Sequence, residues 1–159
     1  SKLIGLYVLL GLKSVVKSNN KRKILLTKRL ENILNNKLKN KVITFLGVTF
    51  KPNTDDMREA SSIPMIKYLN KNNSKIRYHD PSGEKNEFKK LKNVKYCKDI
   101  QSACFNSDLI VLHTEWNDFR LLNFKKLVKK SNFKIFDMRN MYSRTKMKNL
   151  KIKYFAIGR

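Results

Sequence analysis

The chain has 159 residues, of which 41% are hydrophobic, and it carries a formal net charge of +24 at pH 7. This length is enough for one domain with a buried core, and the apolar content argues against wholesale disorder. No apolar run reaches the roughly 20 residues that a membrane-spanning helix needs, so no membrane partner is expected.

Residues 1–40 predict a helix, because apolar residues recur there at spacings of three and four: Leu26, Leu30, Ile33, Leu34 and Leu38. From Lys41 onward, short apolar runs alternate with more polar stretches. The apolar runs predict strands at 42–48, 75–79, 94–97, 108–113, 133–136 and 152–156. Helices are expected from Ser61 or Ser62, either of which could cap the first turn, to Asn72, and at 100–105 and 121–130.

This alternation is typical of an α/β domain with a mostly parallel sheet and helices on both faces. We therefore predict that residues 41–159 form such a domain and that residues 1–40 form a helical segment before it. Open sheets of this type bind ligands at the carboxyl ends of their strands. The segments that leave these ends are 47–58, 79–81, 113–116 and 137–140, and a functional site is expected among them.

The first predicted strand is not followed by a glycine-rich turn, since only Gly47 stands there and bulky residues follow it. The backbone is therefore not expected to approach a pyrophosphate closely, and cationic side chains would have to bind it. Lys51 and Arg58 are available in this loop, although in so lysine-rich a chain both could equally be solvated. Asp55 and Asp56 are expected to order the loop, by accepting backbone N–H bonds or by pairing with Arg58.

Four segments of the chain resemble motifs of the UDP-glucose/GDP-mannose dehydrogenase family, in the same order. The loop Gly47-Val-Thr-Phe-Lys-Pro-Asn-Thr-Asp-Asp-Met-Arg-Glu-Ala60 is similar to the G-x-T-F-K-P-N-T-D-D-x-R-E-x segment of that family. Tyr78-His-Asp-Pro81, Thr114-Glu-Trp116 and Asp137-Met-Arg-Asn140 are similar to its later Y-D-P, T-E-W and D-x-R-N motifs. The resemblance covers essentially the whole chain, with one local departure at Ser61, where the family usually has proline.

The resemblance implies a Rossmann-like domain that binds a UDP-sugar. It implies that Phe50 and Lys51 contact the UDP-sugar and that Arg139 reaches it from the adjacent strand end. It also implies that Arg58 lies near the NAD cofactor, across a cleft between two domains. No residue of this chain is expected to be catalytic.

The family's catalytic cysteine segment, G-G-x-C-x-P-K-D, and its glycine-rich NAD-binding domain have no counterpart in these 159 residues. The resemblance therefore implies that the chain is the C-terminal, nucleotide-sugar-binding part of an NAD-dependent enzyme and is inactive alone. The intact enzyme would oxidise the C6 alcohol of UDP-glucose, or of a close relative, to a carboxylate in two hydride transfers. Its N-terminal domain would bind NAD, and residues 1–40 would be the tail of a central helix that supports a homodimer.

Two other classes of function stay open at this point. The chain could be a stand-alone nucleotide-binding module that needs a partner polypeptide. The charge of +24 also raises nucleic-acid binding. However, the lysines are spread through the chain and no nucleic-acid-binding motif is present, so a general lysine and asparagine bias explains the charge better.

The remaining reactive side chains have ordinary interpretations. Cys97 and Cys104 fit no zinc-binding spacing and are expected to be reduced thiols, at least partly buried, which favours a cytoplasmic location. His79 and His113 have no metal-like partner nearby in the sequence, so no metal site is expected. Asp80 precedes a proline and is expected to form a turn rather than to bind a ribose.

Overall fold

The computed structural model describes residues 2–158, with side chains from residue 5 onward. It has five α-helices, six β-strands and two short 3-10 turns within these residues. The helices are α1 (Lys2–Ile33), α2 (Ser62–Lys71), α3 (Ile100–Cys104), α4 (Phe124–Val128) and α5 (Arg144–Asn149). The strands are β1 (Val42–Leu46), β2 (Lys75–His79), β3 (Val94–Tyr96), β4 (Leu109–Leu112), β5 (Lys134–Asp137) and β6 (Lys153–Ala156). The 3-10 turns are η1 (Asn86–Phe88) and η2 (Asn117–Phe119).

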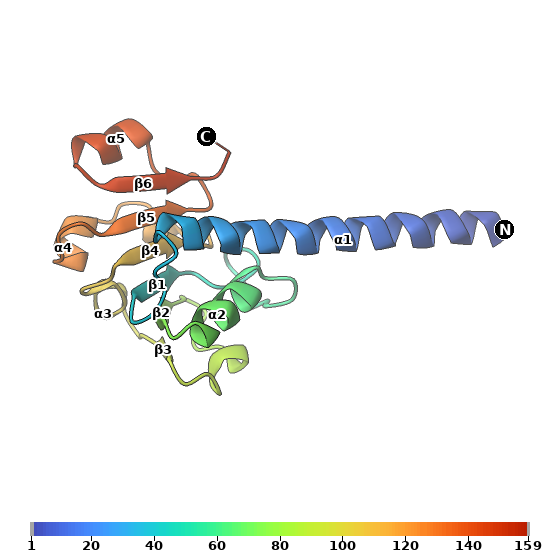
Figure 1. The fold of residues 1–159 in the computed structure, drawn as a ribbon, viewed down its shortest axis with the longest axis horizontal. Coiled ribbons are helices and arrows are strands. Elements are labelled where there is room, and N and C mark those ends of the chain that lie inside the picture. The colour runs from blue at the N-terminus through green and yellow to red at the C-terminus, as the bar shows by residue number, and fades with distance from the viewer. Residues whose placement is uncertain (1, 159) are drawn as a thin grey trace.

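The six strands form one sheet in the order β3-β2-β1-β4-β5-β6, and every neighbouring pair is parallel. This confirms the predicted Rossmann-like α/β fold, with a sheet that is wholly parallel. The strand order reverses between β1 and β4, which is where open sheets of this kind bind ligands. In Figure 1, the arrowheads of β5 and β6 point toward the side on which α1 projects, so all six carboxyl ends lie on that side.

Helices cover both faces of the sheet, so both faces are buried. Successive side chains of a strand point to opposite faces and therefore join different cores. Ile43 and Phe45 of β1 belong to the core on the face covered by α1 and α2. Leu46 belongs to the opposite core, with α3 and α4. Thr44 lies between Ile43 and Phe45, and its hydroxyl donates a hydrogen bond of 2.6 Å to the carbonyl of Ala103 at α3.

Three helices differ from the sequence expectation. The helix expected over residues 1–40 ends at Ile33, because Asn35 and Asn36 have positive φ values of 53° and 58°, and the buried Leu38 lies beyond the helix.

The helix expected at 121–130 is shorter and is confined to α4. Leu121, which was expected to begin it, lies outside the helix and is 90% exposed. The side chain of Asn123 accepts a hydrogen bond from the backbone N–H of Lys126 and so defines the helix start. The helix α5 was not predicted, because its sequence is polar and only Met147 is buried in it.

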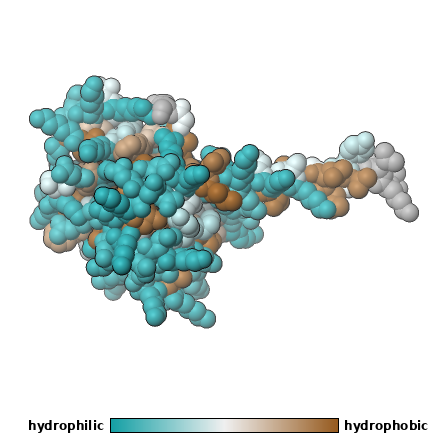
Figure 2. Space-filling view, viewed as in Figure 1, coloured by the Kyte–Doolittle hydropathy of each residue, from teal (hydrophilic) through white to brown (hydrophobic). Residues whose placement is uncertain are grey.

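The helix α1 has two different environments along its length. Its last turns pack on the domain, where Leu30 and Ile33 join the core and Glu31 accepts a 3.0 Å hydrogen bond from the hydroxyl of Tyr68. The guanidinium of Arg29 lies 5.5 Å from the ring centroid of Phe136. The earlier turns project away from the domain (Figure 1) and carry apolar side chains over their surface (Figure 2). The side chains that are more than half exposed there are Leu6, Tyr7, Val8, Leu9, Leu10, Leu12, Val15, Val16, Ile24 and Leu25.

A helix that is apolar on all sides is normally enclosed by other protein or by lipid. Among residues 2–158, however, no helix is both long enough and apolar enough to cross a membrane.

Asparagine takes the place that glycine often has at the ends of elements. Among residues 2–158, eleven non-glycine residues have a positive φ, and eight of them are asparagine. Asn73 follows α2 with a φ of +60°, and Asn106 follows α3 with a φ of +54°. Asparagine is one of the few L-residues that adopt this left-handed conformation readily, so it can end helices in a chain with only five glycines.

We predict that the last turns of α1 stabilise the domain whereas the projecting turns do not. Leu30→Ala removes a fully buried side chain and should lower the free energy of unfolding by about 2–5 kcal/mol. Leu25→Ala, in the same helix but at a position 57% exposed, should change it by less than about 1 kcal/mol. Urea unfolding followed by circular dichroism measures both, and equal losses would contradict the division of α1 into packed and projecting turns.

Candidate functional site

The loop after β1 passes close to the end of β4. Gly47 has a φ of +74°, and a Cβ atom placed on it would lie 2.5 Å from the Cβ of Thr114. Only glycine fits there, because a side chain would overlap Thr114 and would also be strained by the positive φ. The single glycine of this turn is therefore required for packing against β4 rather than for approach to a phosphate.

Asp80, at the end of β2, holds this loop from the other side. One carboxylate oxygen accepts hydrogen bonds from the backbone N–H groups of Val48, at 2.8 Å, and Thr49, at 3.4 Å. The other accepts from the N–H and the hydroxyl of Ser82, at 3.0 and 2.5 Å. Because Asp80 is fully buried and both oxygens are engaged by protein, it cannot bind the ribose of a dinucleotide as the acidic residue at this place does in some Rossmann folds.

His113 follows β4 directly and is 1% exposed. Its Nδ1 lies 3.0 Å from the hydroxyl of Thr114, which donates its own proton to the carbonyl of Thr49 at 2.8 Å. The Thr114 oxygen must therefore accept a hydrogen bond from Nδ1–H, and the remaining ring nitrogen, Nε2, accepts one from the hydroxyl of Ser61 at 2.9 Å. Burial, and to a lesser extent the nearby cation of Arg139, together lower the pKa of His113 to about 3, so the ring is neutral.

The position of Ser61 agrees with the sequence expectation, but its bonding does not. Ser61 occupies the cap position before α2, yet its side chain makes no capping hydrogen bond. Its backbone is already helical, with φ −67° and ψ −16°, whereas a capping side chain needs an extended backbone. The hydroxyl of Ser61 bonds to His113 instead, and that of Ser62 donates to the carbonyl of Val48 at 2.5 Å.

Arg139, at the end of β5, is bonded to the segments that follow β4 and β1. Its Nε donates to the carbonyl of His113 at 2.7 Å, and its Nη2 lies 3.4 Å from the carbonyl of Phe50. The buried carboxylate of Asp137 accepts from the backbone N–H of Arg139 at 2.9 Å and from the hydroxyl of Tyr154 at 2.7 Å. These bonds fix the turn that presents the guanidinium.

A cavity of about 120 Å³ lies between α1 and these strand ends. Phe50 and Arg139 line it together with Arg22, Lys23 and Glu59, so its charged lining carries a net positive charge. Lys23 and Glu59 pair at 2.6 Å, which leaves the two arginines as the excess cations. Its other lining residues are Asn19, Leu26, Ser61, His113, Met138 and Ile157. Larger grooves of about 630 and 680 Å³ lie along α1 and against α2, away from the strand ends.

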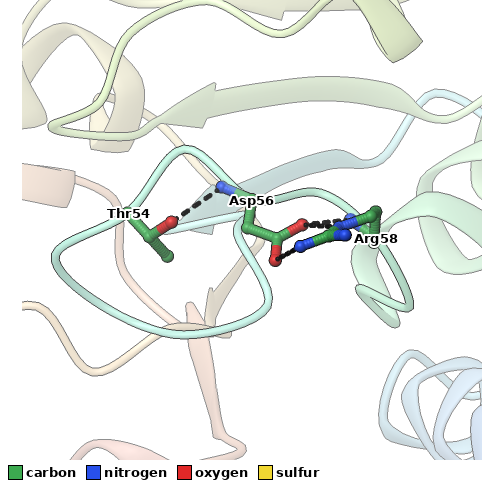
Figure 3. Close-up of polar contacts among 3 residues, drawn as sticks. All are labelled: Thr54, Asp56 and Arg58. Atoms are coloured by element: carbon green, nitrogen blue, oxygen red, sulfur yellow. Dashed lines mark hydrogen bonds and ion pairs between the residues drawn. The ribbon is translucent and has the colours of Figure 1, made fainter.

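The other two residues named by the family resemblance, Lys51 and Arg58, are exposed members of the same loop and do not line the cavity. The Arg58 side chain is 90% exposed and forms a two-pronged pair with Asp56, at 3.0 and 3.1 Å (Figure 3). This contact holds the pKa of Asp56 below its usual value, and the Thr54 hydroxyl accepts a bond from the N–H of Asp56. Of the two aspartates expected to order the loop, Asp56 does so, by bonding both the backbone N–H and the guanidinium of Arg58.

Neither cysteine is suited to nucleophilic chemistry. Cys97 and Cys104 are both buried free thiols, as the sequence analysis expected. Burial raises the pKa of both, to about 12 for Cys104, whereas a reactive cysteine needs a lowered pKa. Within residues 2–158, no three histidine, cysteine, aspartate or glutamate side chains are grouped as metal ligands would be.

The contacts among Ser61, His113 and Thr114 were not predicted from the sequence. Ser61 and His113 are 52 positions apart and meet only because β1 and β4 are neighbours in the sheet. One signal pointed to this place, namely that a histidine directly follows the buried apolar run of β4, at a strand end where ligands bind. That signal identifies the position but not its partners.

Comparison with known proteins gives a consistent result. Residues 44–144 match the UDP binding domain of the UDP-glucose/GDP-mannose dehydrogenase family. The chain is 35% identical over 150 residues to a UDP-glucose 6-dehydrogenase of Rickettsia felis and 36% identical over 152 residues to one of Bacillus subtilis. These alignments cover 92% and 93% of this chain but 34% of each relative, so the chain spans about a third of their length.

Solved structures show the same fold. The chain is similar to the NDP-N-acetyl-D-galactosaminuronic acid dehydrogenase from Methanosarcina mazei, with a TM-score of 0.71 and 24% identity over 87% of this chain and 29% of that one. It is also similar to a UDP-glucose dehydrogenase from Pyrobaculum islandicum, with a TM-score of 0.68 and 23% identity over 90% of this chain and 31% of that one.

We predict that His113 stays neutral between pH 8 and pH 5. Nuclear magnetic resonance of a histidine-labelled sample tests this, because the chain has only two histidines and His113→Asn identifies the signal. Ring signals that titrate near pH 6.5 in the folded chain would contradict the deduced neutral state.

The same lowered pKa predicts a pH dependence of stability. In the unfolded chain His113 takes up a proton near pH 6.5, whereas the folded chain resists protonation down to about pH 3. Its contribution to stability is therefore complete above pH 6.5 and is lost by about 1.4 kcal/mol per pH unit below it. The stability advantage of the unsubstituted chain over His113→Asn should shrink accordingly from pH 6.5 to pH 4.5 in urea unfolding, and a constant difference would contradict this.

Proposed function

The chain belongs to the UDP-glucose/GDP-mannose dehydrogenase family and carries its UDP binding domain, and we propose that it is the nucleotide-sugar-binding part of a UDP-glucose 6-dehydrogenase. The complete enzyme would convert UDP-glucose to UDP-glucuronate in the cytoplasm, with NAD as the hydride acceptor in both oxidation steps. The observation that carries this proposal is the meeting of Phe50 and Arg139 at a positively charged cavity on the carboxyl edge of the sheet.

In this proposal Arg139, Lys51 and Phe50 bind the UDP-sugar. Arg139 has five N–H donors, of which two are engaged by protein carbonyls, so three are free for the oxygens of a diphosphate. Lys51 adds a second positive charge from the β1 loop, and Phe50, which is 49% exposed, offers an apolar surface beside it. A diphosphate next to an apolar ring system is the chemistry that such a set of side chains fits.

The described part of this chain does not itself fit a dinucleotide such as NAD. The turn after β1 has Val48 and Thr49 where close approach to a pyrophosphate requires glycine, and the carboxylate of Asp80 is occupied by backbone N–H groups. We therefore propose that a separate N-terminal domain binds NAD and contributes the catalytic cysteine. Arg58, exposed and bonded only within its own loop, would face that cofactor across the cleft between the domains.

The projecting turns of α1 support a larger assembly. The five consecutive apolar residues 6–10 cover more than one full helical turn and are each more than half exposed. Figure 2 shows apolar surface along these turns. In the proposed enzyme the NAD-binding domain and a second copy of the chain would cover them. Residues 1–40 would then be the tail of the central dimerisation helix, and residues 41–159 the UDP-sugar-binding domain.

We predict that the proposed phosphate contacts are specific rather than a result of overall charge. Lys51→Ala and Arg139→Ala should each weaken UDP binding roughly ten- to a hundredfold by calorimetry, which is the effect of losing a charge-assisted hydrogen bond of about 1.5–3 kcal/mol. Lys89→Ala and Arg120→Ala remove the same charges from exposed positions away from the strand ends, and they should change the affinity little. Arg58→Ala should also spare UDP binding.

A different outcome would contradict specific phosphate contacts. If all five substitutions weaken UDP binding equally and added salt abolishes the binding in each case, the chain binds UDP through diffuse charge, and the assigned site is wrong.

We also predict that the purified 159-residue chain does not reduce NAD in the presence of UDP-glucose. Both thiols are buried with raised pKa values, and the described residues provide no dinucleotide site. The absorbance of NADH measures this directly, with a complete enzyme of the family as the positive control. NADH formation that co-purifies with the chain would contradict the proposal that a separate domain binds NAD and contributes the catalytic cysteine.

A further inference from the structure

We infer that His113 is a positioning residue for the sugar-nucleotide site, which acts by fixing the direction of the Arg139 guanidinium through its own backbone carbonyl. This inference rests on the proposed function, because that function assigns Arg139 to the substrate. His113 itself need not touch the ligand.

His113 connects three separate segments of the chain: the connection between β1 and α2, the end of β4 and the turn after β5. Its Nε2 is bonded to Ser61, before α2, and its Nδ1 to Thr114, after β4. The hydroxyl of Thr114 in turn donates a hydrogen bond to the carbonyl of Thr49 in the β1 loop. The carbonyl of His113 accepts from Nε of Arg139, after β5, at 2.7 Å.

The direction of the Arg139 guanidinium depends on its hydrogen bonds. Arg139 is exposed as a whole, and a long exposed side chain ordinarily samples many rotamers. Its planar guanidinium is held at Nε by one short bond to His113, and more weakly at Nη2 by the carbonyl of Phe50. Since the group is planar, fixing Nε determines where the unengaged N–H groups point. Movement of the His113 carbonyl would therefore redirect the groups that are proposed to bind the diphosphate.

Few side chains could replace the imidazole of His113. The site needs a donor toward Thr114 and, at the opposite end of a ring, an acceptor toward Ser61. Asparagine could reproduce the donor but not the distant acceptor. The ring also packs against Phe45, with the ring centroids 6.4 Å apart, and at 1% exposure no solvent is available to satisfy a lost partner.

Ser61 provides independent support. It stands at the cap position of α2, where serine usually stabilises the helix by bonding a backbone N–H, yet its hydroxyl is directed to His113. The local fold thus uses this hydroxyl to hold the imidazole rather than to cap the helix.

A double-substitution cycle tests whether His113 acts through Arg139. UDP affinity is measured by calorimetry for the unsubstituted chain, His113→Asn, Arg139→Ala and the double variant. Because His113 and Arg139 are in contact, we expect His113→Asn to weaken UDP binding by at least about threefold in the unsubstituted chain. It should cause no further loss when Arg139 is already alanine. Equal losses in both backgrounds would overturn the inference.

Two further variants separate positioning from general stability. Thr44→Val removes another fully buried hydroxyl, bonded at 2.6 Å to the carbonyl of Ala103, and it should lower the melting temperature while sparing UDP affinity. Ser61→Ala loosens the ring from its other end and gives the same comparison if His113→Asn does not fold. A loss of affinity in Thr44→Val as large as that in Ser61→Ala would mean that lower stability alone explains the effect, and the inference would be wrong.

A measurement without ligand distinguishes failure of this inference from failure of the proposed function. In the unsubstituted chain the Arg139 Nε proton should exchange slowly with water, because it is hydrogen-bonded to the backbone carbonyl of His113. Ser61→Ala or His113→Asn should speed this exchange. If the chain binds no UDP but this proton responds as expected, the proposed function fails and the positioning of Arg139 stands. If the exchange rate does not respond, the inference fails whatever UDP does.

Discussion

The parallel pairing of β1 with β4, and of β4 with β5, brings the carboxyl ends of three strands to one edge of the sheet. Inside the sheet the backbone groups bond to neighbouring strands, and helices cover both faces, so unpaired backbone groups are available mainly at the strand ends. Every contact of the candidate site follows from this arrangement. Gly47 passes Thr114, Thr114 bonds Thr49, and Arg139 reaches the carbonyls of His113 and Phe50, which follow β4 and β1.

The large positive charge of the chain and the candidate site have different physical roles. A net charge of +24 creates a field that attracts any anion, and salt screens it at distances beyond about 10 Å. A field of this kind does not define where or how a nucleotide sits. Arg139 differs from the surrounding lysines because two carbonyls hold it in a fixed direction, which gives it geometry as well as charge.

The sequence predicted the fold well because its strands are short apolar runs whose chemistry is local. The strand at 75–79 was predicted with its observed bounds, and the others within one or two residues. The helix α5 was missed because six polar residues with one buried Met147 carry no apolar periodicity. For the site, a linear motif located the loop that holds Phe50 and Lys51, but no local pattern could reveal that His113 joins Ser61 to Arg139. Those contacts depend on strand order, which brings together residues far apart in the chain.

The asparagines at positive φ have a consequence for the unfolded chain. Glycine in these places would adopt the same conformation, but it would also leave the unfolded backbone free to explore more states. At a compatible position, replacing glycine by a residue with a side chain stabilises a protein by about 0.4–1 kcal/mol, mainly by restricting that unfolded ensemble. Eight asparagines in left-handed conformations therefore let this chain end its helices and turn its loops while losing less conformational entropy when it folds than eight glycines would.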